Sequence, residues 1–202
     1  MPLYSDREYA KIIEDERRAN ESHKREYLYG LANIPYRHSR CTVTDVCTGW
    51  TKAFAEIGAL NNGYIVALLG QRGTGKTQMA VQIMRQHISR LRSAFYTAAL
   101  DIFLSVRDAN RTQTSEKQAL SKYVVPYLLV IDECQERGET PFEDRMLTYI
   151  IDSRYGGLHN TILISNQTSA EFEKSMGSSV LSRMQETGGI KLFNWSSFRV
   201  NT

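Results

Sequence analysis

Short apolar runs alternate along the chain with longer stretches in which apolar residues recur at helical spacing. Apolar runs bounded by glycine or polar residues are typical of buried parallel strands. The expected strands lie at residues 64–69, 94–99, 127–132, 161–165 and 190–194. The expected helices lie at residues 76–92, 101–109 (with Asp101 as the cap), 115–125 and 141–155. This alternation predicts an α/β fold in three layers, in which helices cover both faces of a mostly parallel five-stranded sheet.

Ahead of the first strand, residues 5–31 have the pattern of one long helix. Ser5 and Glu8 have the spacing of a capping box, and a short apolar stripe follows them. The remainder is densely charged with both signs, which is typical of a solvated helix face. Because so polar a segment cannot form its own core, it must either dock on a partner or remain a solvated helix. Both readings stay open.

The chain is expected to divide into two parts. Residues 1–33 would form a helical arm, and residues 34–202 would form the α/β domain. Residues 30–49 contain Pro35 and several turn formers, so the hinge between the two parts is placed there.

Composition limits the class of protein. The 202 residues are 42% hydrophobic and 23% charged, which is typical of a globular protein with one core. A net charge of +3 allows a nucleic-acid partner without indicating one. The first residues lack the apolar segment of a secretory signal, and no apolar run approaches the ~20 residues that span a bilayer. We therefore expect a cytoplasmic protein that is not membrane-embedded.

A phosphate-binding motif follows the first expected strand. The sequence GQRGTGKT, residues 70–77, matches G-x-x-x-x-G-K-[ST] between a strand and a helix, which is the context that this motif needs. Gly73 and Gly75 allow tight turns, so that backbone N–H groups can converge on phosphate oxygens. Lys76 would reach the β- and γ-phosphates, and the Thr77 hydroxyl would ligate Mg²⁺. The residues expected to bind ATP here are Gly70, Gly73, Thr74, Gly75, Lys76, Thr77 and Gln78.

A second motif, LLVIDE, ends the third expected strand with two carboxylates. Ligands of open α/β sheets bind at the carboxyl ends of the strands. Asp132 would therefore hold Mg²⁺ together with Thr77, and Glu133 would act as the general base that activates water. The two motifs together predict binding of ATP and Mg²⁺, with hydrolysis. The sequence has no Arg-rich lid segment of the kind that a small-molecule kinase uses.

Beyond these widely shared motifs, the sequence resembles one group of proteins. The segments VLSRM (180–184) and FNWSSFR (193–199) are similar to the carboxyl-terminal signature of the DnaC-type helicase loaders. IPYRHSRCTVTD (34–45) and YIIDSRYGGLHNTILISN (149–166) are also similar to segments of that group. The resemblance covers residues 34–199 and extends to the DnaI and IstB ATPases, within the AAA+ superfamily.

The resemblance implies roles for further residues. Asn166 falls on the sensor-1 position, Arg183 on the arginine-finger position and Arg199 on a sensor-2-like position. An arginine finger stabilises charge on the phosphoryl oxygens of a neighbouring subunit's site. Ser179 stands where family loaders often carry another arginine, and the resemblance implies a domain without the AAA+ helical lid. The expected catalytic residues are Lys76, Glu133, Asn166 and Arg183.

The resemblance also implies partners. A loader of this type would bind a hexameric replicative helicase through its arm, self-associate through its ATPase domain and contact single-stranded DNA. Residues 103–124 correspond to the extra helical insert of initiator-type AAA+ proteins. The candidate phosphate contacts within it are Arg107, Arg111, Lys117 and Lys122. Because Asp108 and Glu116 are interspersed among them, a solvated helix is an equal reading.

Two other functions fit the same motifs. One is an IstB-like transposition ATPase that acts with a transposase on double-stranded DNA. The other is an adaptor that binds ATP but hardly hydrolyses it, which Ser179 and the missing lid would explain. The charge-rich arm and modest size would suit a phage or prophage protein.

Overall fold

The computed structural model describes residues 6–41, 46–111 and 115–199, without the side chains of residues 6–9, 12 and 110. The capping box expected at Ser5 and Glu8 therefore lies outside the described residues, as does part of the 34–45 segment.

The centre of the molecule is a five-stranded sheet in which every strand pair is parallel. The strands are β1 (Ile65–Gly70), β2 (Ala94–Ala98), β3 (Leu128–Asp132), β4 (Asn160–Ser165) and β5 (Gly189–Phe193). Their order across the sheet is β2-β3-β4-β1-β5, so β1 lies between β4 and β5, and Ala67 pairs with both Leu163 and Ile190. The predicted strands are confirmed, with bounds that differ by about one residue.

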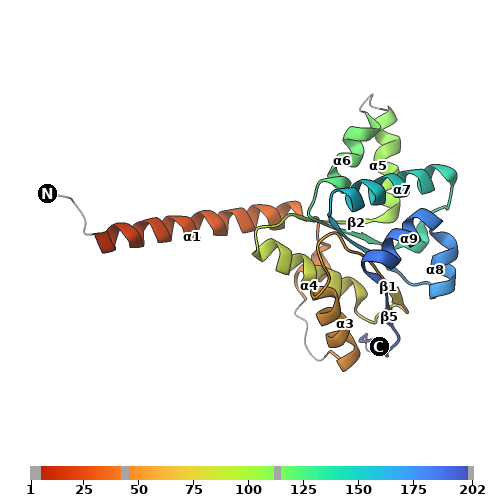
Figure 1. Cartoon of the computed structure of the whole chain (residues 1–202), viewed down its shortest axis with the longest axis horizontal. Coiled ribbons are helices and arrows are strands. Elements are labelled where there is room, and N and C mark those ends of the chain that lie inside the picture. Colours follow the sequence, from red (N-terminus) through yellow and green to blue (C-terminus); the bar gives the residue numbers. More distant parts are fainter. Residues whose placement is uncertain (1–5, 42–45, 112–114, 200–202) are drawn as a thin grey trace.

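Helices cover both faces of the sheet (Figure 1). They are α1 (Asp6–Leu31), α2 (Tyr36–Ser39), α3 (Thr48–Gly58), α4 (Lys76–Ser89), α5 (Ala99–Arg111), α6 (Glu116–Val124), α7 (Pro141–Gly156), α8 (Ser169–Ser175) and α9 (Ser178–Thr187), with a 3₁₀ turn at Cys134–Glu136. Side chains of β1 point alternately to the two faces of the sheet, so the strand contributes to a separate core on each face. Ile65, Ala67 and Leu69 pack with α5 to α9, whereas Val66 and Leu68 pack with α3 and α4. The expected three-layer α/β fold is confirmed.

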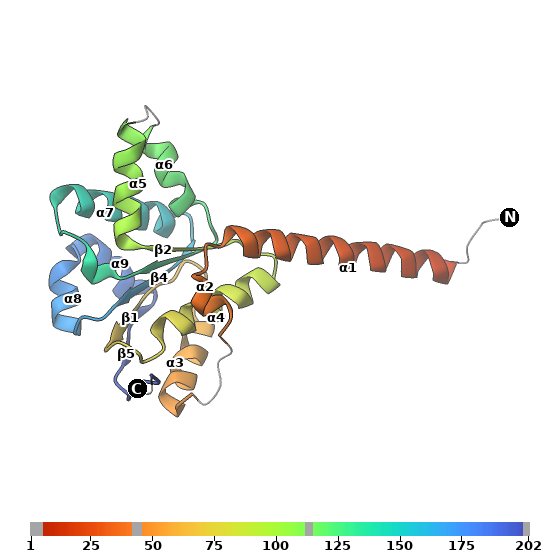
Figure 2. The same ribbon diagram turned by 180° about the vertical axis from the view of Figure 1, so that it is seen from behind.

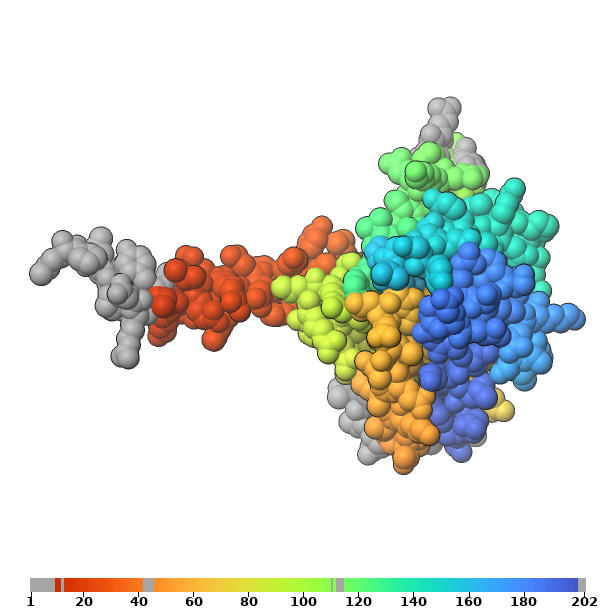
Figure 3. All heavy atoms as spheres, in the orientation of Figure 1, coloured from red at the N-terminus to blue at the C-terminus, as the bar shows by residue number. Residues whose placement is uncertain are grey.

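Helix α1 extends away from this three-layered body (Figures 1 and 2). Its projecting part is lined by ion pairs one turn apart, such as Arg18 Nε to Glu14 Oε1 at 3.0 Å. Its last turns rest on the body, where Arg25 Nε donates to the Ser89 carbonyl oxygen at 3.1 Å, and Ala32 beyond the helix is fully buried. The described part of the arm thus projects from the body and is packed on it at the carboxyl end of α1 (Figure 3).

Some helices differ from the sequence-based expectation. Helix α5 begins at Ala99, so Asp101 lies in its first turn and is not its cap. Helices α2, α3, α8 and α9 are absent from the elements predicted above. Helix α3 was missed because Gly49 and neighbouring turn formers obscure its start. Its buried residues Trp50, Ala53 and Ile57 nevertheless have helical spacing. Within the described part of the chain, no helix combines the length and the apolar character needed to cross a bilayer.

Candidate nucleotide-binding site

The loop between β1 and α4 has the backbone conformation that its glycines permit. Gly73 and Gly75 have φ angles of 86° and 87°, in the left-handed region that other residues rarely adopt. A Cβ at Gly73 would overlap the Ser197 hydroxyl, and one at Gly75 would lie 3.0 Å from Trp50 Nε1. Both positions therefore need glycine for conformation and for space.

Three N–H groups from outside the loop fix its carbonyl groups. Trp50 Nε1 donates to Gly75 O at 3.2 Å, and Trp195 Nε1 donates to Thr74 O at 3.0 Å. The Phe198 amide donates to Gly73 O at 2.9 Å. With its carbonyls held from α3 and from the segment after β5, the loop is kept in one conformation with its amides available for a ligand.

Lys76 lies at the centre of this loop and is 5% exposed. Its ammonium group donates to the carbonyl oxygens of Gly70 at 2.5 Å and Gln71 at 2.8 Å. Burial lowers the pKa of Lys76 to about 8, against the opposing effect of Asp132, and the nearby cations Arg199 and Arg72 lower it further. A partly desolvated cation beside other cations at a helix N-terminus favours an anionic ligand, so the loop fits a nucleotide's phosphates.

Asp132 lies beside Lys76 at the end of β3 and is almost buried. Its Oδ2 atom accepts hydrogen bonds from Thr77 Oγ1 at 2.8 Å and from the Tyr96 hydroxyl at 2.7 Å. Its Oδ1 atom accepts one from the Glu133 amide at 2.7 Å. A hydroxyl from the start of α4 next to a carboxylate from the end of β3 is the oxygen-donor set that suits Mg²⁺.

Glu133 follows Asp132 in a left-handed conformation, with φ 55° and ψ 41°. Such a conformation costs a non-glycine residue on the order of 1 kcal/mol, which is a form of strain often found at functional sites. Burial raises the pKa of Glu133, and Asp132 and Glu136 raise it further. A carboxyl group with a raised pKa at the edge of a phosphate site is suited to accept a proton from water.

One cavity of about 450 Å³ collects most of the predicted residues. Those that line it are Gly73, Gly75, Lys76, Thr77, Gln78, Asp132, Glu133, Asn166 and Arg199. Two other loop residues face elsewhere. Thr74 is buried and donates to the Gln71 carbonyl oxygen at 2.9 Å, and Gly70 lines a neighbouring cavity.

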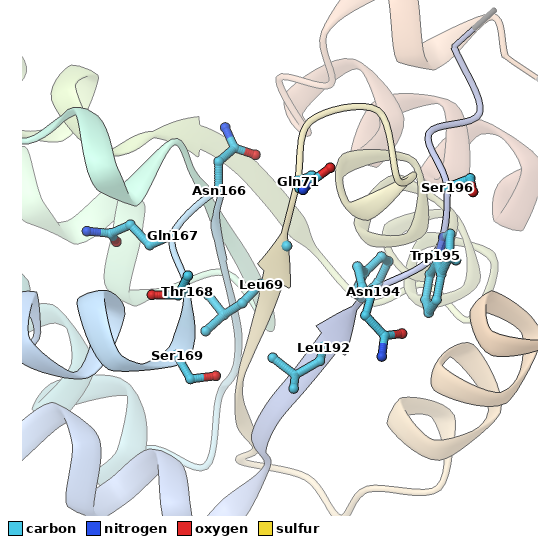
Figure 4. A pocket seen from close by; sticks show the side chains of 12 residues that line it. Leu69, Gln71, Asn166, Gln167, Thr168, Ser169, Leu192, Asn194, Trp195 and Ser196 are labelled. Atoms are coloured by element: carbon cyan, nitrogen blue, oxygen red, sulfur yellow. The ribbon is translucent and has the colours of Figure 1, made fainter.

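That neighbouring cavity, of about 580 Å³, lies between the ends of β1, β4 and β5 (Figure 4). Asn166 and Thr168 lie on the side of the loop after β4, and Leu192, Asn194 and Trp195 lie on the side of β5. Asn166 borders both cavities, and its backbone N–H donates to Gln135 Oε1 at 3.1 Å.

Arg183 lies apart from the residues that line the nucleotide cavity, on α9. Its Nε atom is 3.2 Å from Asp152 Oδ1, and its Nη1 atom donates to the Ser179 carbonyl oxygen at 2.9 Å and also to the Ser179 hydroxyl. The guanidinium group lies over the Tyr155 ring. Ser179, which stands where the resemblance implies another arginine, is thus a direct partner of the expected arginine finger.

The four candidate DNA contacts lie on the α5–α6 pair, which projects from the body (Figure 1). Arg111 is 83% exposed at its side chain, whereas Arg107 contacts the Phe142 ring and lies 4.0 Å from Glu143. Lys122 lies over the Tyr123 ring. Lys117 is exposed.

Sequence reasoning missed several residues that line the nucleotide cavity: Pro35, His38, Arg72, Tyr96 and Ile164. His38 Nδ1 lies 3.0 Å from Gln78 Oε1, which brings α2 against α4. Tyr96 lies on β2, and no motif marks it. Only the pairing of β2 with β3, in which Ala98 is opposite Asp132, could have indicated that residues near the end of β2 belong to the site.

Known proteins are similar to this chain over most of its length. Replicative helicase loader DnaC of Escherichia coli (strain K12) is 28% identical over 192 residues, which cover 90% of this chain and 78% of that protein. The insertion sequence IS5376 putative ATP-binding protein of Geobacillus stearothermophilus is 27% identical over 177 residues, covering 85% of this chain and 68% of that protein.

The fold has known counterparts as well. A crystal structure of the DnaC helicase loader superposes with a TM-score of 0.67 at 17% identity, covering 78% of this chain and 99% of that chain. The expected P-loop AAA+ fold is thereby confirmed, as is the resemblance to the loader group. A family model described as IstB-like ATP binding protein matches residues 13–185. Since that model spans most of the chain, this protein belongs to the family of IstB-like ATP binding proteins.

Proposed function

We propose that this protein is an ATP-dependent loader that binds a hexameric replicative helicase and helps to place it on single-stranded DNA. The observation that carries the proposal is the combination of a preformed nucleotide site with a 26-residue helix that is packed at one end only. A loader needs both parts, one to hold a partner and one to make that hold depend on ATP. The similarity to DnaC covers 90% of this chain, so it includes at least part of the arm as well as the domain.

The nucleotide site supports binding and hydrolysis of Mg-ATP. The loop amides and Lys76 would hold the phosphates, and Thr77 and Asp132 would hold Mg²⁺, which would neutralise charge on the phosphate oxygens. Glu133, with its raised pKa, would take a proton from the attacking water, and Asn166 would orient that water. Arg199 would add a positive charge at the same cavity.

The exposed face of α1 supports a protein partner. Ile13 is 63% exposed and Tyr27 is 67% exposed, on a helix whose other surface residues are mostly charged. A helix that presents a few apolar side chains beside charges of both signs can dock in a groove of another protein. We therefore propose that this face of α1 binds the helicase.

Mass measurement by light scattering tests the assignment. The chain is mixed with a hexameric replicative helicase, with Mg-ATP and without it. One variant lacks residues 1–20, which removes the projecting half of α1 and keeps the turns that pack on the body from Arg25 onward. A second variant is Lys76→Ala, which keeps the arm and removes the central cation of the nucleotide site. Circular dichroism confirms that both variants are folded.

We expect the full chain to form a complex that the truncated chain does not form. The Lys76→Ala variant should bind the helicase without any effect of ATP on the mass of the complex. A complex that persists without residues 1–20 would exclude the projecting half of α1 as the docking surface. If the full chain forms no complex under any condition, the loader assignment fails.

The second candidate is a transposition ATPase, which the match to the IstB-like model and to the IS5376 protein favours. It would act with a transposase on double-stranded DNA. Co-sedimentation with a long duplex in Mg-ATP distinguishes the two, because a transposition ATPase should coat the duplex in the absence of any helicase. The adaptor reading remains if ATP binds and is not turned over even with the helicase and single-stranded DNA present.

A further inference from the structure

Tyr96 joins two parts of the molecule that the proposed function treats separately. Its hydroxyl group donates to Asp132 Oδ2 at 2.7 Å, inside the nucleotide cavity. Its backbone faces the other way, toward the end of the arm. The Tyr96 amide donates to the Ala32 carbonyl oxygen at 2.9 Å, and the Asn33 side-chain amide donates to the Tyr96 carbonyl oxygen at 2.9 Å.

These bonds follow from the position of β2 in the sheet. β2 is an edge strand with β3 on one side, so the outer N–H and C=O groups of Tyr96 need other partners. The residues that follow α1 supply them. Ala32 is fully buried, and Asn33 takes a left-handed conformation with φ 52°, which turns its side chain back to the strand. The base of the arm thus closes the edge of the sheet.

The segment that follows α1 continues to the wall of the nucleotide cavity. Pro35 and His38, a few residues past Asn33, line the nucleotide cavity, and His38 contacts Gln78 of the phosphate loop's helix. The arm therefore enters the body directly at the wall of the nucleotide site. Tyr96 is the residue in this region with bonds on both sides, to the arm's base and to the carboxylate.

We propose that Tyr96 is a positioning residue that orients Asp132 for Mg²⁺ and couples this carboxylate to the base of the arm at Ala32 and Asn33. The inference rests on the proposed Mg-ATP site. Partners that orient a metal-binding carboxylate commonly change metal affinity by about 10- to 100-fold when they are removed. Because coupling between two sites is reciprocal, a partner that holds the arm would change the affinity for Mg-nucleotide, and Mg-nucleotide would change the order of the arm's base.

The first test compares Tyr96→Phe with a matched control, Tyr64→Phe. Tyr64 is 4% exposed, just ahead of β1 in the same sheet, and its hydroxyl has no hydrogen-bond partner among the described residues. Binding of a fluorescent ATP analogue is measured as Mg²⁺ is titrated, and again in EDTA. We expect Tyr96→Phe to raise the Mg²⁺ concentration needed for half-maximal binding about tenfold. The affinity of Tyr96→Phe for the ATP analogue in EDTA should equal that of the wild type. Tyr64→Phe should match the wild type both in Mg²⁺ and in EDTA.

The second test is amide hydrogen exchange of residues 28–36, measured with the ATP analogue in Mg²⁺ and in EDTA. In the wild type we expect Mg²⁺ to slow exchange there by about fivefold, because it fixes Asp132 and with it Tyr96. The slowing should disappear in Tyr96→Phe. It should also disappear in Asn33→Gly, a variant that permits the left-handed conformation, lacks the side-chain donor and leaves the phosphate loop intact.

The outcomes separate this inference from the proposed function. If the wild type fails to bind the ATP analogue in Mg²⁺, the proposed function fails. If it binds, and Tyr96→Phe has the same Mg²⁺ dependence as Tyr64→Phe, the positioning role is wrong. If Mg²⁺ leaves exchange at residues 28–36 unchanged in the wild type, or slows it equally in Tyr96→Phe, the coupling is wrong although the nucleotide site stands. Thermal melts of each variant confirm that the comparison is made on folded protein.

Discussion

At the scale of single residues, Arg154 is a fully buried cation whose bonding partners are neutral oxygens. It donates to the carbonyl oxygens of Tyr123, Val124 and Pro126 at 2.9 to 3.0 Å, to Thr161 Oγ1 at 2.9 Å and also to the Asn160 carbonyl oxygen. Burial lowers its pKa from the usual value for arginine. Arg154 therefore satisfies the carbonyl groups at the connection between α6 and β3, with His159 Nδ1 as a second partner of the Val124 carbonyl oxygen at 2.9 Å.

Replacement of Arg154 should destabilise the protein mainly because buried carbonyl groups lose their hydrogen-bond donor, and less because packing is lost. Arg154→Met keeps most of the volume and leaves several buried carbonyl groups unpaired, at roughly 1 to 3 kcal/mol each before relaxation. We expect the free energy of unfolding in urea to fall by at least about 3 kcal/mol. Arg145→Met on the exposed side of α7 is the matched control and should change it by less than about 0.5 kcal/mol. Equal effects of the two substitutions would contradict this role of Arg154.

His87 makes the stability of the protein depend on pH. It is 8% exposed on α4, and burial lowers its pKa from 6.5 to about 4, with Arg92 and Arg90 lowering it further. His87 therefore becomes protonated near pH 6.5 in the unfolded chain but only near pH 4 in the folded protein. Stability from this residue is present above pH 6.5 and is lost as the pH falls toward 4, by about 2 kcal/mol at pH 5.

The measurement is the free energy of unfolding in urea at pH 7.5 and at pH 5. The wild type should lose about 2 kcal/mol more than His87→Gln between these two values, because the variant has no proton to bind at this position. If both proteins show the same loss, His87 is charged in the folded state and the acid sensitivity comes from other groups.

At the scale of elements, the α5–α6 pair presents a mixed surface. Leu100 and Leu104 are 43% and 46% exposed on α5, and the more exposed arginine, Arg111, lies at the end of the same helix. Arg107 is tied to Phe142 and Glu143, so its substitution would also affect packing against α7. Arg111 and Lys117 are therefore the cleaner probes of DNA contact.

Charge reversal at Arg111 and Lys117 should weaken binding of single-stranded DNA if these side chains contact phosphates. The slope of log affinity against log salt is negative, and each lost contact should reduce its magnitude by about 0.7. Fluorescence anisotropy of a labelled oligonucleotide at several salt concentrations measures this, with Arg145→Glu on α7 as the matched control. An unchanged slope in the double variant would leave α5 and α6 as a solvated surface.

The elements differ in how far the sequence predicted them. The strands and the phosphate loop were predictable because each has a local signal, an apolar run or a fixed glycine spacing. Helix α3 was missed because a local turn signal at Gly49 competes with helical spacing that only burial of Trp50 explains. Tyr96 had no local signal at all, since its role depends on strand order and on the residues after α1.

At the scale of the whole molecule, the position of Arg183 raises the question of whether this arginine acts on the nucleotide site of a second copy of the chain. In this chain Arg183 lies on α9, bonded to Ser179 and near Asp152, apart from the cavity that contains Lys76 and Glu133. An arginine that served its own subunit would be expected in that cavity. A head-to-tail assembly would instead offer each subunit's Arg183 to the site of the next subunit.

Mixing two inactive variants tests this arrangement. Lys76→Ala removes the nucleotide site and keeps the finger, whereas Arg183→Ala removes the finger and keeps the site. Each alone should hydrolyse ATP slowly, even with the helicase and single-stranded DNA present. In an equal mixture with random neighbours, about a quarter of the interfaces combine an intact site with an intact finger, so about a quarter of wild-type hydrolysis should return. Hydrolysis is measured as phosphate release at constant total protein.

The control replaces the first partner with the double variant Lys76→Ala/Arg183→Ala, which supplies neither group and should restore nothing. Recovery in the test mixture alone would place Arg183 in the neighbouring site. If Arg183→Ala hydrolyses ATP as fast as the wild type, Arg183 has no role in hydrolysis, and its bonds to Ser179 and Asp152 serve the packing of α9. If Arg183→Ala is slow and the mixture stays slow, the arginine acts within its own subunit, and α9 must rearrange when nucleotide binds.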